Sequence, residues 1–317
     1  MRVAVLADSH LQRHLLREAL TGLGHQVTVN MDPAQLEAAT LHQHVADVWL
    51  VCLHGMDRHQ QALLEQLYEL DTPVLIGEGE APQRGTEDHQ RWQRSLDKKL
   101  FALGKPQAGQ PLQCLDPPVL PPADSGPAQQ VWLLVASLGG PAAVKEFLDH
   151  LPGNLPVGFL YAQHIDQKLE ESLPRAVGRH SQWQVRLASH NDFIRSGEVV
   201  VVPVSQELTF TACGRMQCSG QPWSGSYAPS FEQMILNLAA GFGRRCGVIV
   251  FSGMGEDGSV ACIDAAGMGM QIWTQCSQSS TCPSMPDSIR QTGYSSYSGS
   301  PCELARAMVT HAGGISF

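Results

Sequence analysis

Short apolar runs alternate with amphipathic stretches in the N-terminal third of the chain. The apolar runs predict buried strands at residues 3–6, 26–29, 45–53 and 73–76. Residues 10–23 carry leucine and alanine at helical spacing, with Leu11 among the residues expected on the inward face. Asp32-Pro33-Ala34-Gln35 predicts a second helix start, because it offers an N-cap, a proline at the first helical position and a capping glutamine. Strands that alternate with helices favour a doubly wound parallel sheet.

The same alternation resumes at residue 131. It predicts strands at residues 132–136, 156–162, 199–202, 247–251 and 270–274. It also predicts a helix carrying Leu169, Leu173 and Val177, and a hairpin over residues 207–219. Capping boxes are expected at Ser230-Phe231-Glu232-Gln233 and Ser300-Pro301-Cys302-Glu303, each opening a helix. The fold class that follows is α/β, with two doubly wound parallel-sheet domains.

A proline-rich stretch separates these two halves. Residues 105–130 hold seven of the chain's 20 prolines and show neither helical nor alternating periodicity. Such a composition favours an extended, semi-rigid spacer. The sequence therefore predicts an N-terminal domain at residues 1–104, a linker at 105–130 and a second domain at 131–317.

The amino-acid composition argues against several classes of function. Lys and Arg number 21 against 30 Asp and Glu, and no segment concentrates the basic residues, which argues against a nucleic-acid partner. No apolar run approaches the roughly 20 residues that a membrane-spanning helix needs, so we expect no membrane insertion and a cytoplasmic protein. The nine cysteines include no C-x-x-C pair, so no zinc site is indicated; we expect neither a metal nor another cofactor.

Three residues with complementary chemistry follow three predicted strands. Ser137 follows the strand that ends at Ala136, His164 follows the one that ends at Ala162, and Asp257 lies in the loop after Phe251. The carboxyl ends of parallel strands converge on one crevice. A nucleophilic serine needs a base within reach, and that base needs a carboxylate to orient it. The pattern indicates a Ser-His-Asp triad.

Each of these residues also has an ordinary structural interpretation. A serine before two glycines is commonly a turn or capping residue, a lone histidine can pack or cap, and Asp257 lies in a glycine-rich loop. Leu138-Gly139-Gly140 could alternatively form a phosphate loop. That nucleotide-binding hypothesis is weak, because the chain has no G-x-G-x-x-G, no G-K-[ST] and no acidic residue placed for a ribose.

The second domain contains five short sequence motifs and through them resembles the catalytic domain of chemotaxis receptor methylesterases of the CheB type. They are ASLGGP at 136–141, AQHID at 162–166, VVVVPV at 199–204, FSGMGEDGS at 251–259, and Met285-Pro286. The resemblance implies hydrolysis of glutamate γ-methyl esters on methyl-accepting chemotaxis receptors, often with glutamine deamidation. It makes Ser137 the nucleophile, His164 the base and Asp257 its orienter, with the Met254 backbone N–H in the oxyanion hole.

The chain departs from this family at a few positions. Leu138 stands where threonine is usual, Tyr227-Ala228-Pro229-Ser230 replaces a His-Arg-Pro-Ser word, and Asp287 stands where arginine is common. Fewer cations near the cleft should weaken docking to an acidic receptor helix or change which receptor fits. The alternative to an active esterase is a regulatory module that binds receptor arrays or signalling partners, such as a chemosensory histidine kinase, without hydrolysis.

The N-terminal domain resembles a response-regulator receiver that has lost its phosphorylation chemistry. A receiver uses an acidic pair after its first strand, and here only Asp8 remains, beside Ala7. The third strand places Cys52 where the acceptor aspartate belongs, so the resemblance implies no phosphoacceptor. Cys52 as a redox sensor is the alternative, weighed against a plain buried strand residue.

Overall fold

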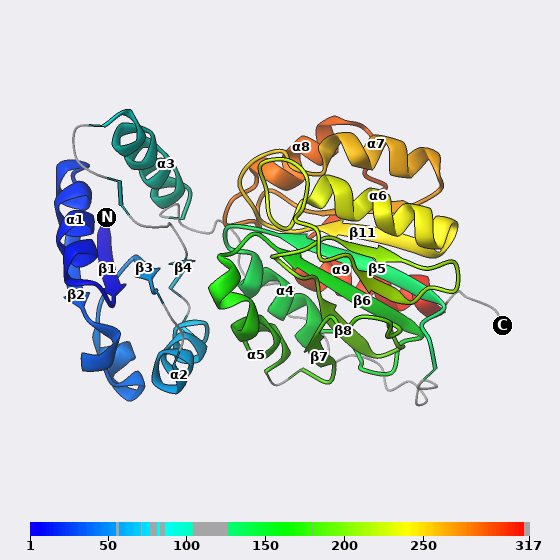
Figure 1. Cartoon of the computed structure of the whole chain (residues 1–317), viewed down its shortest axis with the longest axis horizontal. Coiled ribbons are helices and arrows are strands. Elements are labelled where there is room, and N and C mark those ends of the chain that lie inside the picture. Colours follow the sequence, from blue (N-terminus) through cyan, green and yellow to red (C-terminus); the bar gives the residue numbers. More distant parts are fainter. Residues whose placement is uncertain are drawn as a thin grey trace. The chain divides into compact units, whose positions relative to one another are not determined.

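The structure is a computed structural model that describes residues 1–54, 57–70, 72–76, 81–82, 86–103, 126–179 and 181–313. The chain divides into two compact units (Figure 1). One contains Met1–Pro106 and Ile165–Ser172, and the other contains Gln107–His164 and Leu173–Phe317. Most of the predicted proline-rich linker, residues 105–125, lies outside the described residues.

The N-terminal unit is built on a parallel sheet of four strands in the order β2-β1-β3-β4. Its elements are β1 (Arg2–Ala7), α1 (His10–Gly22), β2 (Gln26–Met31), the 3₁₀ helices η1 (Pro33–Gln35) and η2 (Ala38–Gln43), β3 (Val48–Cys52), α2 (Arg58–Leu67), β4 (Val74–Ile76) and α3 (Glu87–Leu103). Residues alternate across β1, so Ala4 and Leu6 join the same core cluster as Leu63, Leu64 and Leu67 of α2.

Two details of this unit differ from the sequence expectations. Leu11 was expected to face inward, but it is 63% exposed, and Gln12 is buried instead. The reason is a hydrogen bond, since the Gln12 side chain accepts the backbone N–H of Ala81 at 2.9 Å. Asp32 caps a helix start as predicted, but η1 is a single 3₁₀ turn rather than an α-helix.

The C-terminal unit holds a seven-stranded parallel sheet in the order β13-β12-β11-β5-β6-β8-β7. Its strands are β5 (Gln130–Ala136), β6 (Val157–Gln163), β7 (Gln184–Leu187), β8 (Glu198–Val201), β11 (Cys246–Val250), β12 (Gln271–Gln275) and β13 (Tyr297–Gly299), with a separate hairpin of β9 (Leu208–Phe210) and β10 (Met216–Cys218). Its helices are α4 (Gly140–Asp149), η3 (Gln167–Ser172, grouped with the other unit), α5 (Leu173–Gly178), α6 (Phe231–Phe242), η4 (Gly243–Arg245), α7 (Ser259–Gly267), α8 (Ser284–Gln291) and α9 (Pro301–Gly313). The predicted α/β class with two parallel sheets is confirmed.

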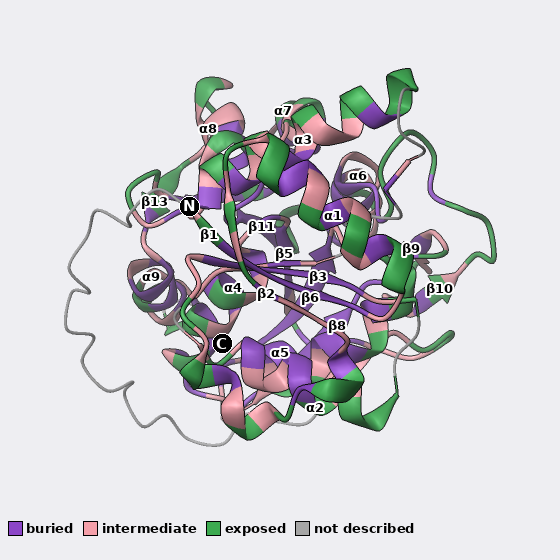
Figure 2. Ribbon diagram, turned by 90° about the vertical axis from the view of Figure 1, so that its left-hand side faces the viewer, coloured by how far each residue is buried: buried purple, intermediate pink, exposed green. Residues whose placement is uncertain are grey.

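Helices cover both faces of this sheet. In Figure 1, α6, α7 and α8 lie on one side, and α4, α5 and α9 lie on the other. The central strands are buried on both faces, which is why they read as continuous apolar runs; Figure 2 shows β5 and β6 in the buried colour. The chain runs outward from β5 through β6 to one side and then returns through β11 to the other. Because of this reversal, the topological switch point lies between the carboxyl ends of β5 and β11.

The sequence pattern missed the two edge strands, β7 and β13. It also predicted one helix over Leu169, Leu173 and Val177, where the structure has the 3₁₀ turn η3 followed by the short α5. Of the two predicted capping boxes, Ser300 and Glu303 exchange both hydrogen bonds. At Ser230 only the hydroxyl half forms, because the Gln233 side chain bonds elsewhere.

Candidate active site

The structure brings Ser137, His164 and the loop that carries Asp257 to the same edge of the seven-stranded sheet. Strands β5 and β6 are paired to their last residues, with Ala136 opposite Gln163. Ser137 and His164 each follow one of these strands, and the His164 N–H donates to the Ala136 carbonyl at 3.1 Å. The Ser137 N–H donates at 3.0 Å to the carbonyl of Ser252, which follows Phe251 in the loop after β11. The strand-end prediction therefore placed the three segments correctly.

His164 and Asp257 form a direct hydrogen bond. The Nε2 atom of His164 lies 3.0 Å from the Oδ2 atom of Asp257, and both side chains are largely buried. The same carboxylate accepts the backbone N–H groups of Phe231 at 2.9 Å and Glu232 at 3.2 Å. These are the first N–H groups of α6, where the helix dipole favours a negative charge. Asp257 is thus held as a hydrogen-bond acceptor aimed at the imidazole.

A reciprocal cap fixes the position of Asp257. Asp257 lies just before α7 and caps α6, while Glu232, in the first turn of α6, caps α7. The Glu232 carboxylate accepts the N–H of Val260 at 3.1 Å and that of Ala261 at 2.6 Å. Each helix start therefore supplies the carboxylate that the other needs, and this exchange locks the loop that carries Asp257.

Ser137 lies on a tight, closely packed turn. Its hydroxyl makes no hydrogen bond within the described part of the chain, to His164 or to any other residue. The buried Ser252 hydroxyl stabilises the turn by donating a hydrogen bond to the Leu138 carbonyl at 2.7 Å. A Cβ on Gly253 would come within 3.0 Å of the Ser137 Cβ, so the loop can pass this closely only with glycine at that position. The serine oxygen remains available for chemistry.

The Gln163 side chain ties the serine and histidine segments together. This buried amide donates to the Ser137 carbonyl at 2.9 Å and to the His164 carbonyl at 3.1 Å. Its own oxygen accepts the Tyr161 hydroxyl at 2.7 Å. A Cβ on Gly140 would lie 2.6 Å from that oxygen, so the first residue of α4 must be small. Sequence reasoning missed Gln163, although a polar residue closing an otherwise apolar strand was the available signal.

If the Ser-His-Asp arrangement is hydrolytic, we expect the Gln163→Glu variant to lose about 30-fold in kcat, with the fold retained. A carboxylate has nearly the same shape but cannot donate, so two carbonyls lose their donor and the serine and histidine segments can separate. The rate should be measured beside a thermal melt. The matched control is Tyr161→Phe, which keeps both amide donors and should cost less than about threefold; equal losses would mean that the amide donors are not what matters.

The backbone N–H of Met254 lies between two backbone donors that are already paired. The N–H groups on either side are occupied, because that of Gly253 donates to the Cys282 carbonyl at 2.9 Å and that of Gly255 to the Ser284 hydroxyl at 3.2 Å. Among the described residues, the Met254 N–H has no acceptor. An unpaired N–H beside the serine turn is the kind of donor that stabilises a developing oxyanion.

Two aromatic rings lie parallel to the imidazole of His164. The Phe231 ring is 3.8 Å away between centroids, with 4° between planes, and the Tyr227 ring is 5.0 Å away with 9° between planes. From the sequence, Tyr227 was noted only as a position where the chain differs from the family, and neither ring was connected with His164. Their separation of more than 60 positions from His164 left no local signal.

The corresponding edge of the N-terminal sheet has different chemistry. Cys52 ends β3, is paired with Ala7 and is buried. The Asp8 carboxylate accepts the His54 backbone N–H at 2.7 Å and lies 2.5 Å from the His54 ring nitrogen. Burial acts to raise the pKa of Asp8, but the hydrogen bonds from His54 outweigh it and the pKa is lowered. Within the described ranges, no group of three or more His, Cys, Asp and Glu side chains could hold a metal ion.

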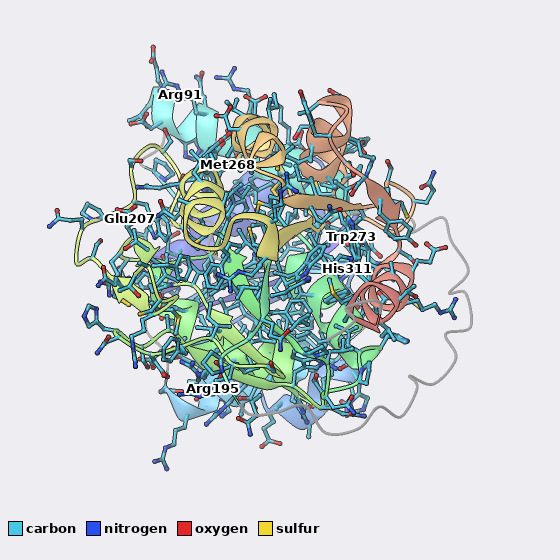
Figure 3. The ribbon with its side chains drawn as sticks, turned by 90° about the vertical axis from the view of Figure 1, so that its right-hand side faces the viewer. Arg91, Arg195, Glu207, Met268, Trp273 and His311 are labelled. Atoms are coloured by element: carbon cyan, nitrogen blue, oxygen red, sulfur yellow. The ribbon has the colours of Figure 1, made fainter. Side chains whose placement is uncertain are left out.

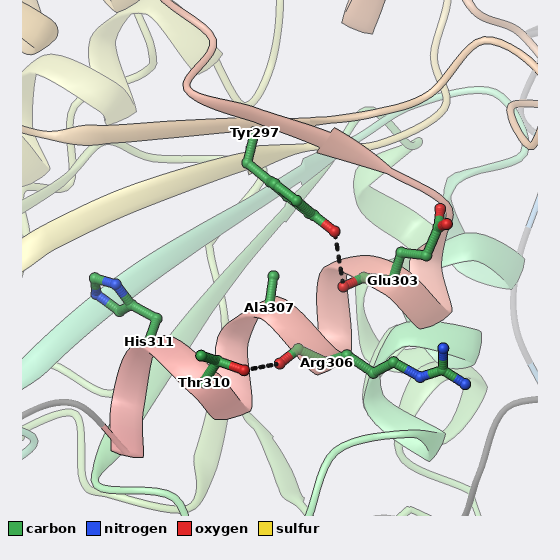
Figure 4. A pocket seen from close by; sticks show the side chains of 6 residues that line it. All are labelled: Tyr297, Glu303, Arg306, Ala307, Thr310 and His311. Atoms are coloured by element: carbon green, nitrogen blue, oxygen red, sulfur yellow. Dashed lines mark hydrogen bonds between the residues drawn. The ribbon is translucent and has the colours of Figure 1, made fainter.

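A surface pocket of about 520 Å³ lies elsewhere, against β13 and α9 (Figure 4). It is lined by Tyr297, Glu303, Arg306, Ala307, Thr310 and His311. Trp273 packs on both Tyr297 and His311; Figure 3 labels Trp273 and His311. None of the predicted site residues lines this pocket. In the part of the chain that the structure describes, no helix is long and apolar enough to span a membrane.

Comparisons with known proteins point to one family. A sequence model described as CheB methylesterase matches residues 132–308. The chain is 34% identical over 166 residues to protein-glutamate methylesterase/protein-glutamine glutaminase 3 of Myxococcus xanthus, covering 52% of this chain and 46% of that relative. It is 26% identical over 253 residues to the protein-glutamate methylesterase FrzG of Myxococcus xanthus, covering 73% of this chain and 75% of FrzG.

One solved structure has a similar fold. The catalytic domain of the CheB methylesterase of Thermotoga maritima aligns with a TM-score of 0.55 at 19% identity, covering 58% of this chain and 99% of that domain. The chain spans about half the length of the first of the Myxococcus relatives. The family model covers more than half of the chain, including Ser137, His164 and Asp257, and the fold agrees with it. The chain belongs to the CheB methylesterase family.

Proposed function

We propose that this protein is a serine hydrolase that removes γ-methyl esters from glutamates of methyl-accepting chemotaxis receptors. The observation that carries the proposal is the hydrogen bond between His164 and Asp257, located beside the serine turn at the switch point of the sheet. The two Myxococcus relatives are named as protein-glutamate methylesterases, which supports the proposal. The receptor's cytoplasmic helices would be the substrate, and the protein would act in the cytoplasm.

In the proposed mechanism each group has a role that its position supports. Asp257 holds His164 through Nε2, so the Nδ1 atom of the neutral ring is the one left to accept the Ser137 proton. Ser137 Oγ attacks the ester carbonyl, and the Met254 N–H stabilises the oxyanion. His164 then gives its proton to the leaving methoxide, releasing methanol and leaving a glutamyl ester on Ser137. Water activated by His164 hydrolyses that ester, which yields glutamate and restores the serine.

The same steps would convert a glutamine side chain to glutamate with release of ammonia, so deamidation is part of the proposal. The competing function is a regulatory module that binds receptor arrays or a chemosensory histidine kinase without hydrolysis. The two are separated by incubating the full chain with receptor membranes labelled on the methyl group and measuring volatile methanol. Release above the uncatalysed rate supports the esterase, and binding to the membranes without release supports the regulatory module.

We infer that the N-terminal unit is a degenerate receiver, a role supported by its sheet order and by the groups at its carboxyl edge. Cys52 stands at the end of β3, and Asp8 is already engaged by His54. In addition, the Arg13 guanidinium donates to the carbonyls of Ala7 at 2.5 Å and Asp8 at 3.1 Å. A cationic side chain therefore lies beside the position where the acidic pair of a receiver would hold Mg²⁺.

We expect acetyl phosphate with Mg²⁺ neither to label the N-terminal unit nor to raise esterase activity. The reason is that a thiol replaces the acceptor carboxylate and only one acid remains to hold the cation. Incorporation is measured with labelled acetyl phosphate on the full chain, followed by proteolysis and hydroxylamine treatment. Stoichiometric, hydroxylamine-sensitive phosphate within residues 1–104 would show that an acceptor other than Cys52 exists.

A further inference from the structure

The imidazole of His164 has an aromatic ring on each face. Phe231 and Tyr227 are both nearly parallel to it, at centroid distances of 3.8 and 5.0 Å. Two parallel rings this close to one imidazole would collide edge to edge if they shared a face, so they must lie on opposite faces. The His164 imidazole is therefore enclosed between two aromatic rings, and only its ring edges are available to Asp257 and to a substrate.

The two rings differ in how they are held. Phe231 is the first residue of α6 and fully buried, and its N–H donates to Asp257, so its ring is fixed by the same contacts that orient the carboxylate. Tyr227 comes from the loop before α6 and is 46% exposed. Its hydroxyl lies 3.7 Å from the position that a Cβ on Gly255 would take, so the phenol reaches the oxyanion loop. Tyr227 is the outer, solvent-facing wall of the histidine.

We propose that Tyr227 is a positioning residue that holds the His164 ring in its reactive plane and stabilises the imidazolium formed during the reaction. The proposal rests on the proposed esterase function. A ring pressed between two parallel faces cannot rotate out of line with Asp257 and Ser137. When His164 takes the serine proton it becomes cationic, and a cation over an aromatic face is stabilised by the ring quadrupole. Both effects need the aromatic ring, and neither needs the phenol hydroxyl.

The test compares Tyr227→Leu with Tyr227→Phe. We expect the Leu variant to lose about tenfold in kcat, with KM for methylated receptor changed less than about twofold, and the Phe variant to stay within about twofold of wild type. Modification of Ser137 by a fluorophosphonate probe should slow in the same order. Because Tyr227 is half exposed, neither change should alter the melting temperature appreciably. A Phe variant as impaired as the Leu variant would overturn the role of the ring.

A second measurement reports the stacking without any activity. The ring protons of His164, assigned by their loss in a His164→Asn variant, should resonate upfield in histidine-labelled protein because both aromatic faces shield them. They should move downfield in Tyr227→Leu and remain near their wild-type positions in Tyr227→Phe. Unmoved His164 signals in the Leu variant would overturn the stacking, and moved signals with unchanged kcat and labelling rate would overturn the positioning role.

Methanol release tests the proposed esterase function, whereas the fluorophosphonate labelling rates and the His164 ring-proton signals test the role of Tyr227. If the wild-type protein releases no methanol from methylated receptors, the esterase function fails, yet the fluorophosphonate rates and the His164 signals still decide whether Tyr227 positions the histidine. If methanol is released but neither readout responds to Tyr227→Leu, the esterase function stands and the role of Tyr227 is wrong.

Discussion

Replacing Ser137 by alanine is expected to abolish methanol release while leaving the folded state unchanged. The hydroxyl has no hydrogen-bond partner in the described structure, so its removal forfeits no internal bond and should change the free energy of unfolding by less than about 0.5 kcal/mol. The catalytic loss should be large, because in the proposed mechanism Ser137 forms the glutamyl ester. Removal of a triad nucleophile costs on the order of 10⁴-fold or more in kcat.

The comparison is made on the same receptor membranes, with a denaturation curve for each variant. Ser259→Ala is the matched control, since this serine lies two residues after Asp257 and its hydroxyl also makes no hydrogen bond among the described residues. It should retain nearly full activity. A Ser137→Ala variant that kept more than about a tenth of the wild-type rate would show that Ser137 is not the nucleophile.

The sequence could place the candidate catalytic residues because strand ends in a parallel sheet share an edge. Ser137 and His164 follow neighbouring strands directly, so their proximity needs only the strand pairing. Asp257 is different, since it lies well beyond the end of β11 and reaches His164 only through the reciprocal capping of α6 and α7. That exchange depends on how two helices pack, and the sequence shows no more than a carboxylate near each helix start.

The supporting groups were beyond sequence reasoning for a related reason. Gln163 ends an apolar strand, and the pattern gives no indication that its amide bridges two carbonyls on neighbouring segments. Tyr227 and Phe231 meet His164 only after α6 has docked on the sheet.

The edge strands were missed because their apolar signal is short or absent: β7 alternates only Val185 and Leu187 over four positions. β13 reads Tyr-Ser-Gly, and backbone pairing with β12 is what makes it a strand. β7 is partly exposed along its length and carries a charged residue, Arg186, that pairs with the buried Glu198 of β8. Short, polar edge strands protect a sheet against further pairing, so this lack of signal is itself the expected chemistry of an edge.

Asp257→Asn should lower kcat by about 10³-fold or more and also reduce stability. The carboxylate now accepts three hydrogen bonds, from His164, Phe231 and Glu232, whereas an amide has one oxygen and would turn its NH₂ group toward at least one donor. An amide that donates to His164 would favour the wrong tautomer, and a neutral side chain would not stabilise the imidazolium. An unsatisfied N–H at the start of α6 should cost about 1–3 kcal/mol, which a denaturant curve can measure.

The reciprocal cap supplies the control that separates catalysis from folding. Glu232→Gln weakens the cap of α7, where the carboxylate accepts the N–H groups of Val260 and Ala261, but Glu232 has no side-chain contact with His164 in the described structure. It should therefore lose stability on the same scale as Asp257→Asn while keeping kcat within about threefold of wild type. If Glu232→Gln lost activity as severely at equal folded fraction, the effect of Asp257 would come from placing the loop. A large loss confined to Asp257→Asn would assign it to the charge and acceptor that Asp257 presents to the imidazole.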